Sequence, residues 1–393
     1  MVLALKDKAI VSLQLERWTD VWRSRHHIMS RLATQNTVLF ASAPFYVREV
    51  FEKTDRDGLS RISESFYSYV PPKWLPYNYR FSRLNDAVAY LRSRHLQRTL
   101  KKLGMQTPVL YIWHPSMLDL VGRFNESLIV YHVYDEYASF TEQTDGEVDL
   151  IKRQETELLQ KADIVFAASE EILERKRATN QNTYLVRNAV DYDLFSRAVD
   201  PDMTVPEDLK SISRPIIGCV ATQTAYMDLK LIRDVFTIRS DWSFVFVGVE
   251  LKSKETANDE LLALQKMPNV HFIGRRKIAE IPGYLKGFDV CAIPWLLNDV
   301  TLVSSSPLKL YEYFAAGKPI VCKPLPLLAH LKDTLYFATT SDEWITAIEK
   351  ALQSNSHNEI EKRQALAREN TWDQRTEFIA LKIAGELAAR QGR

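Results

Sequence analysis

The chain has 393 residues, of which 46% are hydrophobic and 26% charged, a composition typical of a globular protein with room for two cores. Its 51 Lys and Arg residues nearly balance 50 Asp and Glu residues, so a net charge of +1 provides no overall field for nucleic acid or an acidic partner. No apolar stretch approaches the roughly 18 residues of a membrane span, so any membrane contact is expected from the surface.

The cysteines and the N-terminus indicate a cytoplasmic protein. Cys219, Cys291 and Cys322 are far apart, and each lies within an apolar run, which predicts buried free thiols in a reducing compartment. They lack the spacing of metal ligands, so no metal is expected. The N-terminal "MVLALKDKAIV" turns charged too soon for the apolar core of a signal peptide.

Short apolar runs alternate with helical segments along the first half of the chain. Nearly every position in these runs is apolar or small, which predicts buried parallel strands at 9–14, 37–43, 108–114, 127–135 and 163–169. Helical periodicity separates most of them, at 25–33, 84–103 and 148–162. Ser169 is a predicted N-cap for the helix that follows the fifth strand.

The alternation stops at 196–215, a polar, proline-containing stretch with the composition of a linker. Strand-like runs then resume at 215–221, 243–249, 269–274, 289–295 and 319–324. Thr340 and Glu343 predict a capping box at the start of a later helix.

Two successive alternations of this kind imply two doubly wound, Rossmann-like α/β domains with a cleft between them. We assign residues 1–200 to an N-terminal domain and residues 201–370 to a C-terminal domain. Residues 371–393 are expected to form a C-terminal helix that packs back on the N-terminal domain.

One predicted helix has an unusual charge at its start. Ser306 is a natural N-cap, Pro307 suits the first helical position, and Gly317 is a stop signal. Lys309 lies in the first turn, where the helix dipole disfavours a cation by about 0.3 to 1 kcal/mol, and Glu312 lies on the same face. The two side chains fit an exposed ion pair. They fit equally a nucleoside diphosphate whose phosphates meet the helix start and the ammonium while the carboxylate accepts from ribose hydroxyls.

The stretch "SPLKLYEYFAAGKPIV", residues 306–321, resembles the donor-binding helix of GT-B glycosyltransferases of the family 4-like group, which build bacterial polysaccharides. Other segments agree in order, among them "ADIVFAASEEILERK", "LVRNAVDYDLF" and "NVHFIGRRKIAEIPGYLKGFDVCAIP". The resemblance covers most of the chain from about residue 105 onward. It implies a GT-B architecture with the acceptor in the first domain and a nucleotide sugar, by the family's habit a UDP-sugar, in the second. The donor is then a co-substrate, and no cofactor is expected.

By this resemblance, Glu312 corresponds to the second glutamate of the family's E-x7-E motif, which binds ribose. Lys309 corresponds to a phosphate-side lysine of relatives such as xanthan glucuronosyltransferase. The first glutamate of the motif is replaced by Ser304, and the basic residues that retaining members place after the first strand of the second domain are also missing. These losses favour inversion. The residues expected at the donor are Lys309, Glu312, Ser306, Leu308, Thr222, Gln223, Gly248 and Arg275.

An inverting transfer requires a base near the acceptor hydroxyl, in the first domain. Asp135 ends a predicted strand at the carboxyl edge of the sheet, with Glu136 beside it, although an aspartate there also fits an N-cap. His114 closes another predicted strand and is the second candidate base, although a structural role is commoner for such a histidine. His132 lies in mid-strand and is expected in the core.

Two further features bear on the partners. Trp18, Trp22 and Arg25 fit a contact with a sugar or a lipid phosphate, and they fit packing of the first helix at least as well. The basic segment 91–103 suits the surface of an anionic bilayer, where polyprenyl-linked acceptors reside, and a plain solvated helix is the alternative. The expected localisation is cytoplasmic, with peripheral contact at the inner face of the membrane.

The sequence therefore predicts a hexosyltransferase or glycuronosyltransferase that moves a sugar from a nucleoside diphosphate sugar to a saccharide or lipid-linked acceptor, with inversion and Asp135 as base. One alternative is a retaining transferase of the same fold. Another is a non-catalytic GT-B-like partner subunit, which Ser304 supports. A nucleotide-sugar epimerase shares the two-domain plan, but its arginine-and-glutamate pattern is absent from the sequence.

Overall fold

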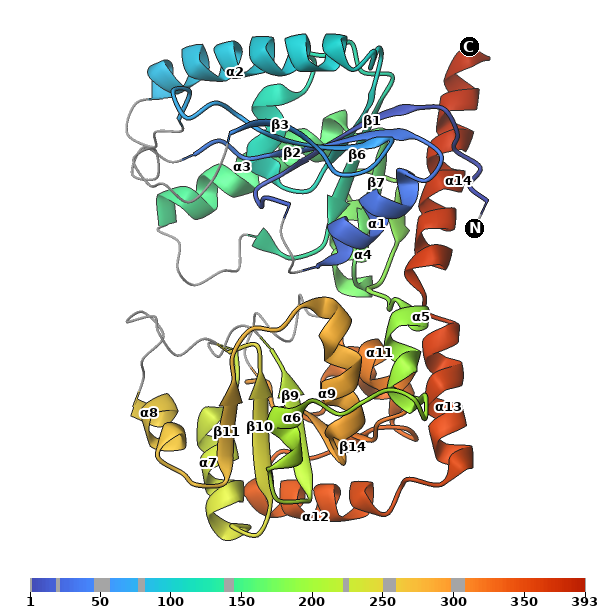
Figure 1. The fold of residues 1–393 in the computed structure, drawn as a ribbon. Helices are drawn as coiled ribbons and strands as arrows, with labels where there is room; N and C mark the ends of the chain where they lie inside the picture. Colours follow the sequence, from blue (N-terminus) through green and yellow to red (C-terminus); the bar gives the residue numbers. More distant parts are fainter. Residues whose placement is uncertain are drawn as a thin grey trace. The chain divides into compact units, whose positions relative to one another are not determined.

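The computed structural model describes residues 2–18, 22–45, 57–76, 82–137, 145–221, 226–249, 259–297 and 308–392. The chain divides into two compact units, each built around one largely parallel sheet with helices on its faces (Figure 1). The first unit consists of Met1–Arg187 with Trp372–Arg393, and the second of Asn188–Thr371.

The sheet of the first unit has the strand order β3-β4-β2-β1-β5-β6-β7-β8. Its strands are β1 (Ala9–Gln14), β2 (Thr37–Ser42), β3 (Gly58–Arg61), β4 (Phe66–Val70), β5 (Val109–Ile112), β6 (Leu128–Val133), β7 (Ile164–Ala167) and β8 (Thr183–Leu185). All neighbours in this order are parallel except β3, which pairs antiparallel with β4 at the edge. The chain builds outward from β1 in one direction and from β5 in the other, so the order reverses between β1 and β5. Such a switch point is where open α/β sheets bind ligands.

The helices of the first unit are α1 (Ser24–Leu32), α2 (Ser82–Lys102), α3 (Asp145–Lys161), α4 (Glu170–Arg177) and α14 (Trp372–Gln391), with the 3₁₀ helix η2 (Pro115–Leu120). The five predicted strands and three predicted helices are confirmed, and Ser169 caps α4 by accepting from the Ile172 N–H. The helix α14 packs on α1, where the Trp372 ring stacks on His27 at 5.1 Å between centroids.

The second unit has the strand order β11-β10-β9-β12-β13-β14, parallel throughout, with its switch point between β9 and β12. Its strands are β9 (Ile216–Val220), β10 (Ser243–Val247), β11 (Val270–Ile273), β12 (Val290–Ile293), β13 (Ile320–Cys322) and β14 (Tyr336–Phe337). Its α-helices are α5 (Tyr192–Phe195), α6 (Glu207–Lys210), α7 (Leu229–Ile238), α8 (Asp259–Gln265), α9 (Ile281–Gly287), α11 (Leu308–Ala315), α12 (Ser341–Leu352) and α13 (His357–Arg368). The 3₁₀ helices are η4 (Ser196–Val199), η5 (Ile278–Glu280) and η6 (Pro326–Leu331). The capping box of Thr340 and Glu343 opens α12 as predicted.

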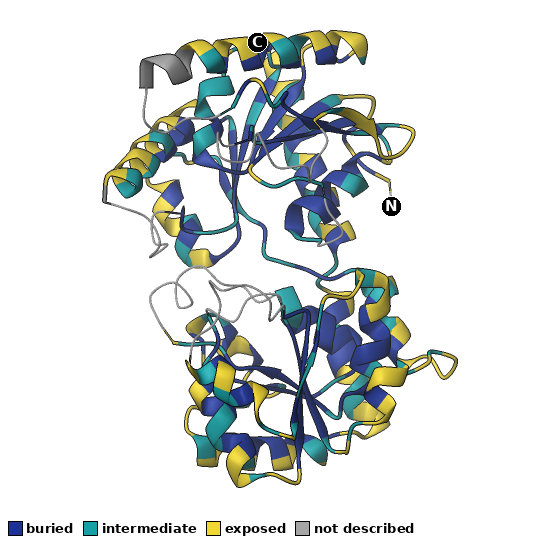
Figure 2. Ribbon diagram, turned by 60° about the vertical axis from the view of Figure 1, so that its left-hand side comes forward, coloured by how far each residue is buried: buried dark blue, intermediate teal, exposed yellow. Residues whose placement is uncertain are grey.

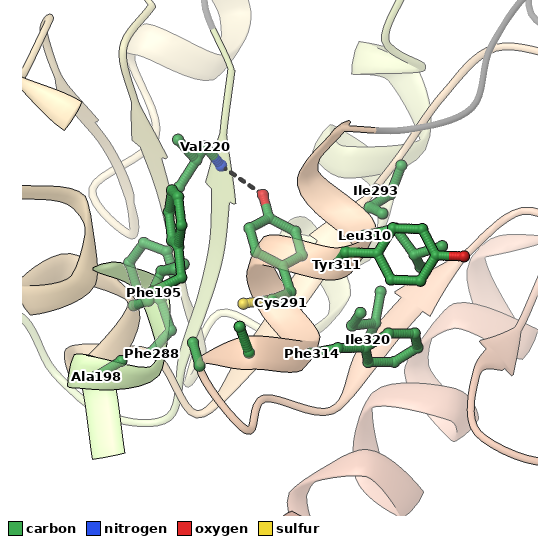
Figure 3. Packing of buried hydrophobic residues seen from close by; sticks show 14 of the residues in the cluster. Phe195, Ala198, Val220, Phe288, Cys291, Ile293, Leu310, Tyr311, Phe314 and Ile320 are labelled. Carbon is green, nitrogen blue, oxygen red and sulfur yellow. Dashed lines mark hydrogen bonds between the residues drawn. The ribbon is translucent and has the colours of Figure 1, made fainter. Parts of the chain in front are cut away.

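The division between the units comes earlier than residue 200, and the predicted linker is wrong. Residues 188–215 belong to the second unit, in which η4 packs against α9. Phe195, Ala198 and Leu209 are each almost fully buried in the same core cluster as Phe288. Figure 3 shows Phe195 and Ala198 next to Phe288. A few apolar side chains therefore fix this segment, although its overall composition is polar.

The sheets form the interior of each unit, as the buried strands in Figure 2 show. Close packing requires glycine at 218, because a Cβ there would lie 2.1 Å from the Phe288 ring. Cys219, Cys291 and Cys322 are buried free thiols, as predicted. Within the described ranges, no helix combines the length and the apolar character that a membrane span requires.

Candidate functional site

The sheet of the second unit opens at its switch point, and a tyrosine from α11 fills the opening. The last residue of β9 that pairs with β12 is Gly218, two residues before the strand ends. Beyond it, the Ala221 N–H still donates to Val247 O of β10, whereas the Val220 N–H faces the other side and donates to the Tyr313 hydroxyl at 2.8 Å (Figure 3). This hydrogen bond fixes α11 to the carboxyl end of β9.

The first turns of α11 carry an ion pair close to the same strand end. The Lys309 ammonium lies 2.9 Å from a carboxylate oxygen of Glu312. The Lys309 side chain is 35% exposed and that of Glu312 only 9%, so the carboxylate is not part of an ordinary surface pair. Burial raises the pKa of Glu312, and the nearby ammonium partly opposes this. The same ammonium acts against the burial that raises the pKa of Cys219 to about 12, which places Lys309 near the end of β9.

Other residues predicted at the donor lie at the same carboxyl edge. Gly248 follows β10 with a positive φ of 104°, and its N–H donates to Ile273 O and Gly274 O. Leu308 is half-buried at the start of α11, and Arg275 is exposed just beyond β11. Thr222, Gln223 and Ser306, together with Ser304, lie outside the described residues.

Asp135 lies at the carboxyl edge of the sheet in the first unit, in an environment that differs from that of Glu312. Asp135 follows β6 and is half-buried, and its carboxylate forms no hydrogen bond or ion pair with any described residue. Burial raises its pKa to about 7, although the positive charges of Arg23 and Arg25 act in the opposite direction. Such a carboxyl can accept a proton near neutral pH.

An ion pair lies beside Asp135. The guanidinium of Arg25 is buried, contacts the Glu16 carboxylate and lies 4.9 Å from the centre of the Tyr134 ring. Arg25 Nε finds no hydrogen-bond partner in the described part of the chain. Burial favours the neutral form of Glu16, but Arg25 and Arg23 outweigh it and lower the pKa of this carboxyl. Glu16 was missed from the sequence, where an acid directly after the first strand was the available signal.

Glu136 takes part in a buried structural cluster. Both of its carboxylate oxygens accept from Lys176 Nζ, at 3.0 and 3.2 Å, and the same ammonium donates to Glu155 at 2.8 Å. Glu155 in turn accepts from the Tyr131 hydroxyl. The cluster ties the end of β6 to α3 and α4, and it leaves Asp135 as the carboxylate of this pair that is open for proton transfer.

His114 and the two tryptophans serve packing in this structure. His114 Nδ1 accepts from the Ser116 N–H at the start of η2, and burial lowers the pKa of the imidazole to about 4. Trp18 packs edge-on against Phe40 and Phe66. Trp22 contacts the His27 ring, so both tryptophans help to seat α1 on the sheet. His132 lies in the core, stacked on Trp113 and bonded to the Tyr111 hydroxyl, as predicted.

Residues 214–354 match the protein family described as Glycosyl transferases group 1. We call this span the group 1 domain. It contains β9 to β14 and both residues of the Lys309–Glu312 pair. The chain is also 29% identical over 234 residues to TuaH from Bacillus subtilis, which is named as a glycosyltransferase of teichuronic acid biosynthesis. The match spans 57% of this chain and 57% of that relative.

Solved structures extend the likeness to the whole chain. Sucrose-phosphate synthase from Thermosynechococcus elongatus matches with a TM-score of 0.70 at 15% identity, over 97% of this chain and 100% of that one. HepE from Anabaena in complex with UDP matches with a TM-score of 0.62 at 14% identity, over 96% and 100%. The catalytic domain of starch synthase IV from Arabidopsis thaliana, bound to ADP and acarbose, gives 0.64 at 11%, over 98% and 100%. At these identities the likeness shows the fold, which is GT-B.

Two charged residues of the group 1 domain were not foreseen from the sequence. Asp228 accepts from the Leu231 N–H to cap α7, and its second oxygen lies 2.5 Å from Lys323 Nζ at the end of β13. An aspartate before an amphipathic helix signals the cap, but nothing in the sequence pairs it with a lysine 95 residues later. The pair links the start of α7 to the end of β13.

In the ranges that the structure describes, no three His, Cys, Asp or Glu side chains are grouped as metal ligands would be. The expectation that transfer needs no metal stays a prediction.

Proposed function

We propose that the protein is a glycosyltransferase that moves a sugar from a nucleoside diphosphate sugar to a saccharide or lipid-linked acceptor. The observation that carries this proposal is the Lys309–Glu312 pair at the switch point of the group 1 domain. A buried carboxylate is unfavourable unless a partner or a ligand stabilises its charge, and in this structure Lys309 is that partner. The relative TuaH, named as a glycosyltransferase, and the HepE structures with UDP and UDP-glucose support the same reading.

In the proposed donor complex, Lys309 and the free N–H groups at the start of α11 bind the diphosphate. Glu312, one turn further, accepts hydrogen bonds from the ribose hydroxyls. The helix terminus and the ammonium then stabilise the negative charge of the leaving group without a metal, so the nucleotide sugar is a co-substrate and no cofactor takes part. UDP is the proposed nucleotide, a choice supported by the UDP-bound structures of HepE.

The proposed mechanism is inverting, with Asp135 as the general base. Its carboxylate removes the proton from the acceptor hydroxyl while that oxygen bonds to the anomeric carbon and the bond to the diphosphate breaks. A pKa of about 7 gives Asp135 both a basic fraction at neutral pH and the strength to hold the proton. Both carboxylate oxygens of Glu136 accept hydrogen bonds from Lys176. This supports Asp135, and not Glu136, as the base.

Release of UDP from a panel of UDP-sugars, with and without a saccharide or polyprenyl-linked acceptor, tests the proposal. We expect acceptor-dependent release, with inverted anomeric configuration of the product by NMR. A retained configuration would leave transfer in place and remove the role of Asp135 as direct base. Nucleotide binding without any release would favour a non-catalytic partner subunit, and conversion of the donor sugar without acceptor would favour an epimerase.

A further inference from the structure

The outward face of α2 carries positive charge without acidic partners. Residues 87–102 contain five Arg and Lys residues and no Asp or Glu. Arg92 is buried and lies 3.5 Å from Asp119 of η2. The other four are exposed, and none of them forms an ion pair within the described part of the chain: Arg94, Arg98, Lys101 and Lys102. Figure 2 shows exposed residues along the outer face of this helix.

On other helices, some exposed cations are paired with an acid of the same helix. On α3, Lys161 pairs with Glu157 four residues earlier, and on α7, Lys230 pairs with Asp234. Because the whole chain has a net charge of +1, the unpaired cations of α2 are a local feature. The field that they create is also felt by His95, whose pKa is lowered by burial and further by Arg98 and Lys102.

Exposed apolar side chains share the face with these cations. Tyr90 is 54% exposed and Leu91 47% exposed. Positions 90 and 91, 94, 98, and 101 and 102 recur every three or four residues, so they form one stripe about 18 Å long. Leu96 and Leu100 on the opposite side pack into the core of the first unit. The helix thus has an apolar face toward the core, and its outer face combines cations with exposed apolar side chains.

We propose that this outer face of α2 docks on the surface of a bilayer that contains anionic lipids. Anionic headgroups would neutralise the four cations, and the interfacial region would take up the Tyr90 and Leu91 side chains. A soluble polyanion would satisfy the cations alone and leave both apolar groups in water. The inference goes beyond the proposed transfer reaction, rests on α2 alone and holds whether or not the chain transfers sugar.

Sedimentation of the full chain with vesicles tests the proposal without any activity assay. The chain is expected to bind vesicles of phosphatidylcholine with phosphatidylglycerol, more weakly as salt is added, and not vesicles of phosphatidylcholine alone. Each cation removed should lower the partition coefficient about fivefold, so Arg98→Gln with Lys101→Gln should lower it about 25-fold. The matched control is Lys332→Gln with Lys362→Gln, which removes two exposed cations of the second unit that form no ion pair with a described residue and should leave binding unchanged.

Two results would overturn the proposal. One is equal vesicle binding by the wild-type chain and the Arg98→Gln, Lys101→Gln variant. The other concerns the apolar groups: Tyr90→Ser with Leu91→Ser should weaken vesicle binding several-fold and leave binding of dextran sulfate unchanged. If the serine variant binds vesicles as well as the wild type does, Tyr90 and Leu91 do not enter the interfacial region, and the cations alone bind polyanions of any kind. All of these side chains are exposed, so circular dichroism is expected to show unchanged folding.

Discussion

The two units present different chemistry at the carboxyl edges of their sheets. At the switch point of the second unit, polar groups are already paired: Lys309 with Glu312, and the Val220 N–H with Tyr313. At the carboxyl edge of the first unit, Asp135 has no such partner among the described residues, and its charge is opposed by burial. A paired, preorganised edge suits binding, whereas an unpaired carboxyl with a raised pKa suits proton transfer. The same architecture therefore supports two roles through the way in which its charges are partnered.

Asp135→Asn is the sharpest test of the first unit's part in this comparison. Removing a general base should lower turnover by about 10²- to 10⁴-fold, while donor affinity measured by calorimetry changes little. In the wild type, kcat/KM should fall about tenfold per pH unit below the pKa of about 7, because protonated Asp135 cannot act as a base. The matched control is Glu136→Gln, which should destabilise the buried cluster with Lys176 and leave the pH profile in place.

The thermal stability of the Asp135→Asn variant is an independent test of the raised pKa of Asp135. Because its pKa is raised on folding from 3.8 to about 7, the stability that the protonated form confers is complete at low pH and is lost as the pH rises to about 7. Asparagine resembles the protonated form, so the variant should unfold at a higher temperature than the wild type above pH 7 and at a similar temperature near pH 4. A destabilised variant at pH 8 would indicate that the carboxylate is a structural cap instead.

Lys309→Ala tests the binding role of the second unit, and its expected effect is smaller than that of Asp135→Asn. Loss of hydrogen bonds from a charged donor should weaken UDP binding by about 1.5 to 3 kcal/mol, measured by calorimetry. Glu312→Gln should weaken UDP but hardly change inorganic pyrophosphate, because only UDP has a ribose. Lys230→Ala is the control, since Lys230 is also the second residue of a helix in this unit and pairs with Asp234. Unchanged UDP affinity in Lys309→Ala would remove the assignment of the donor to α11.

Local signals made much of this architecture predictable. Buried parallel strands appear as continuous apolar runs, and caps such as Ser169 and Thr340 use short-range hydrogen bonds that the sequence displays. The edge strand β3 and the short strands β8 and β14 lack such runs and were missed, and β4 was missed although four of its five residues are buried. The segment 196–215 was misassigned because composition cannot show that Ala198 and Leu209 meet a hydrophobic core.

Some residues of the candidate sites could likewise be predicted from the sequence, and others could not. Lys309 and Asp135 were predicted because each stands at an element end that the sequence marks, and Glu312 because it shares a helix face with Lys309. The Glu16–Arg25 and Asp228–Lys323 pairs join residues from separate elements, so only the folded chain reveals them. The sequence also could not separate Asp135 from Glu136, since that difference depends on Lys176, which reaches Glu136 from α4.

Tyr313→Phe tests whether the donor edge depends on a single hydrogen bond that neither sequence pattern nor family motif indicates. The substitution keeps the buried ring and removes only the acceptor of the Val220 N–H, leaving that N–H buried without a partner. Such an orphan costs about 1 to 3 kcal/mol, which urea unfolding of the whole chain would measure. If the bond holds the end of β9 in place for the donor, UDP affinity should fall as well. Tyr336→Phe, on the edge strand β14, removes a hydroxyl without a hydrogen bond to any described residue and should change neither quantity. Lower stability with unchanged UDP affinity would restrict Tyr313 to the core and separate the opening of the sheet from ligand binding.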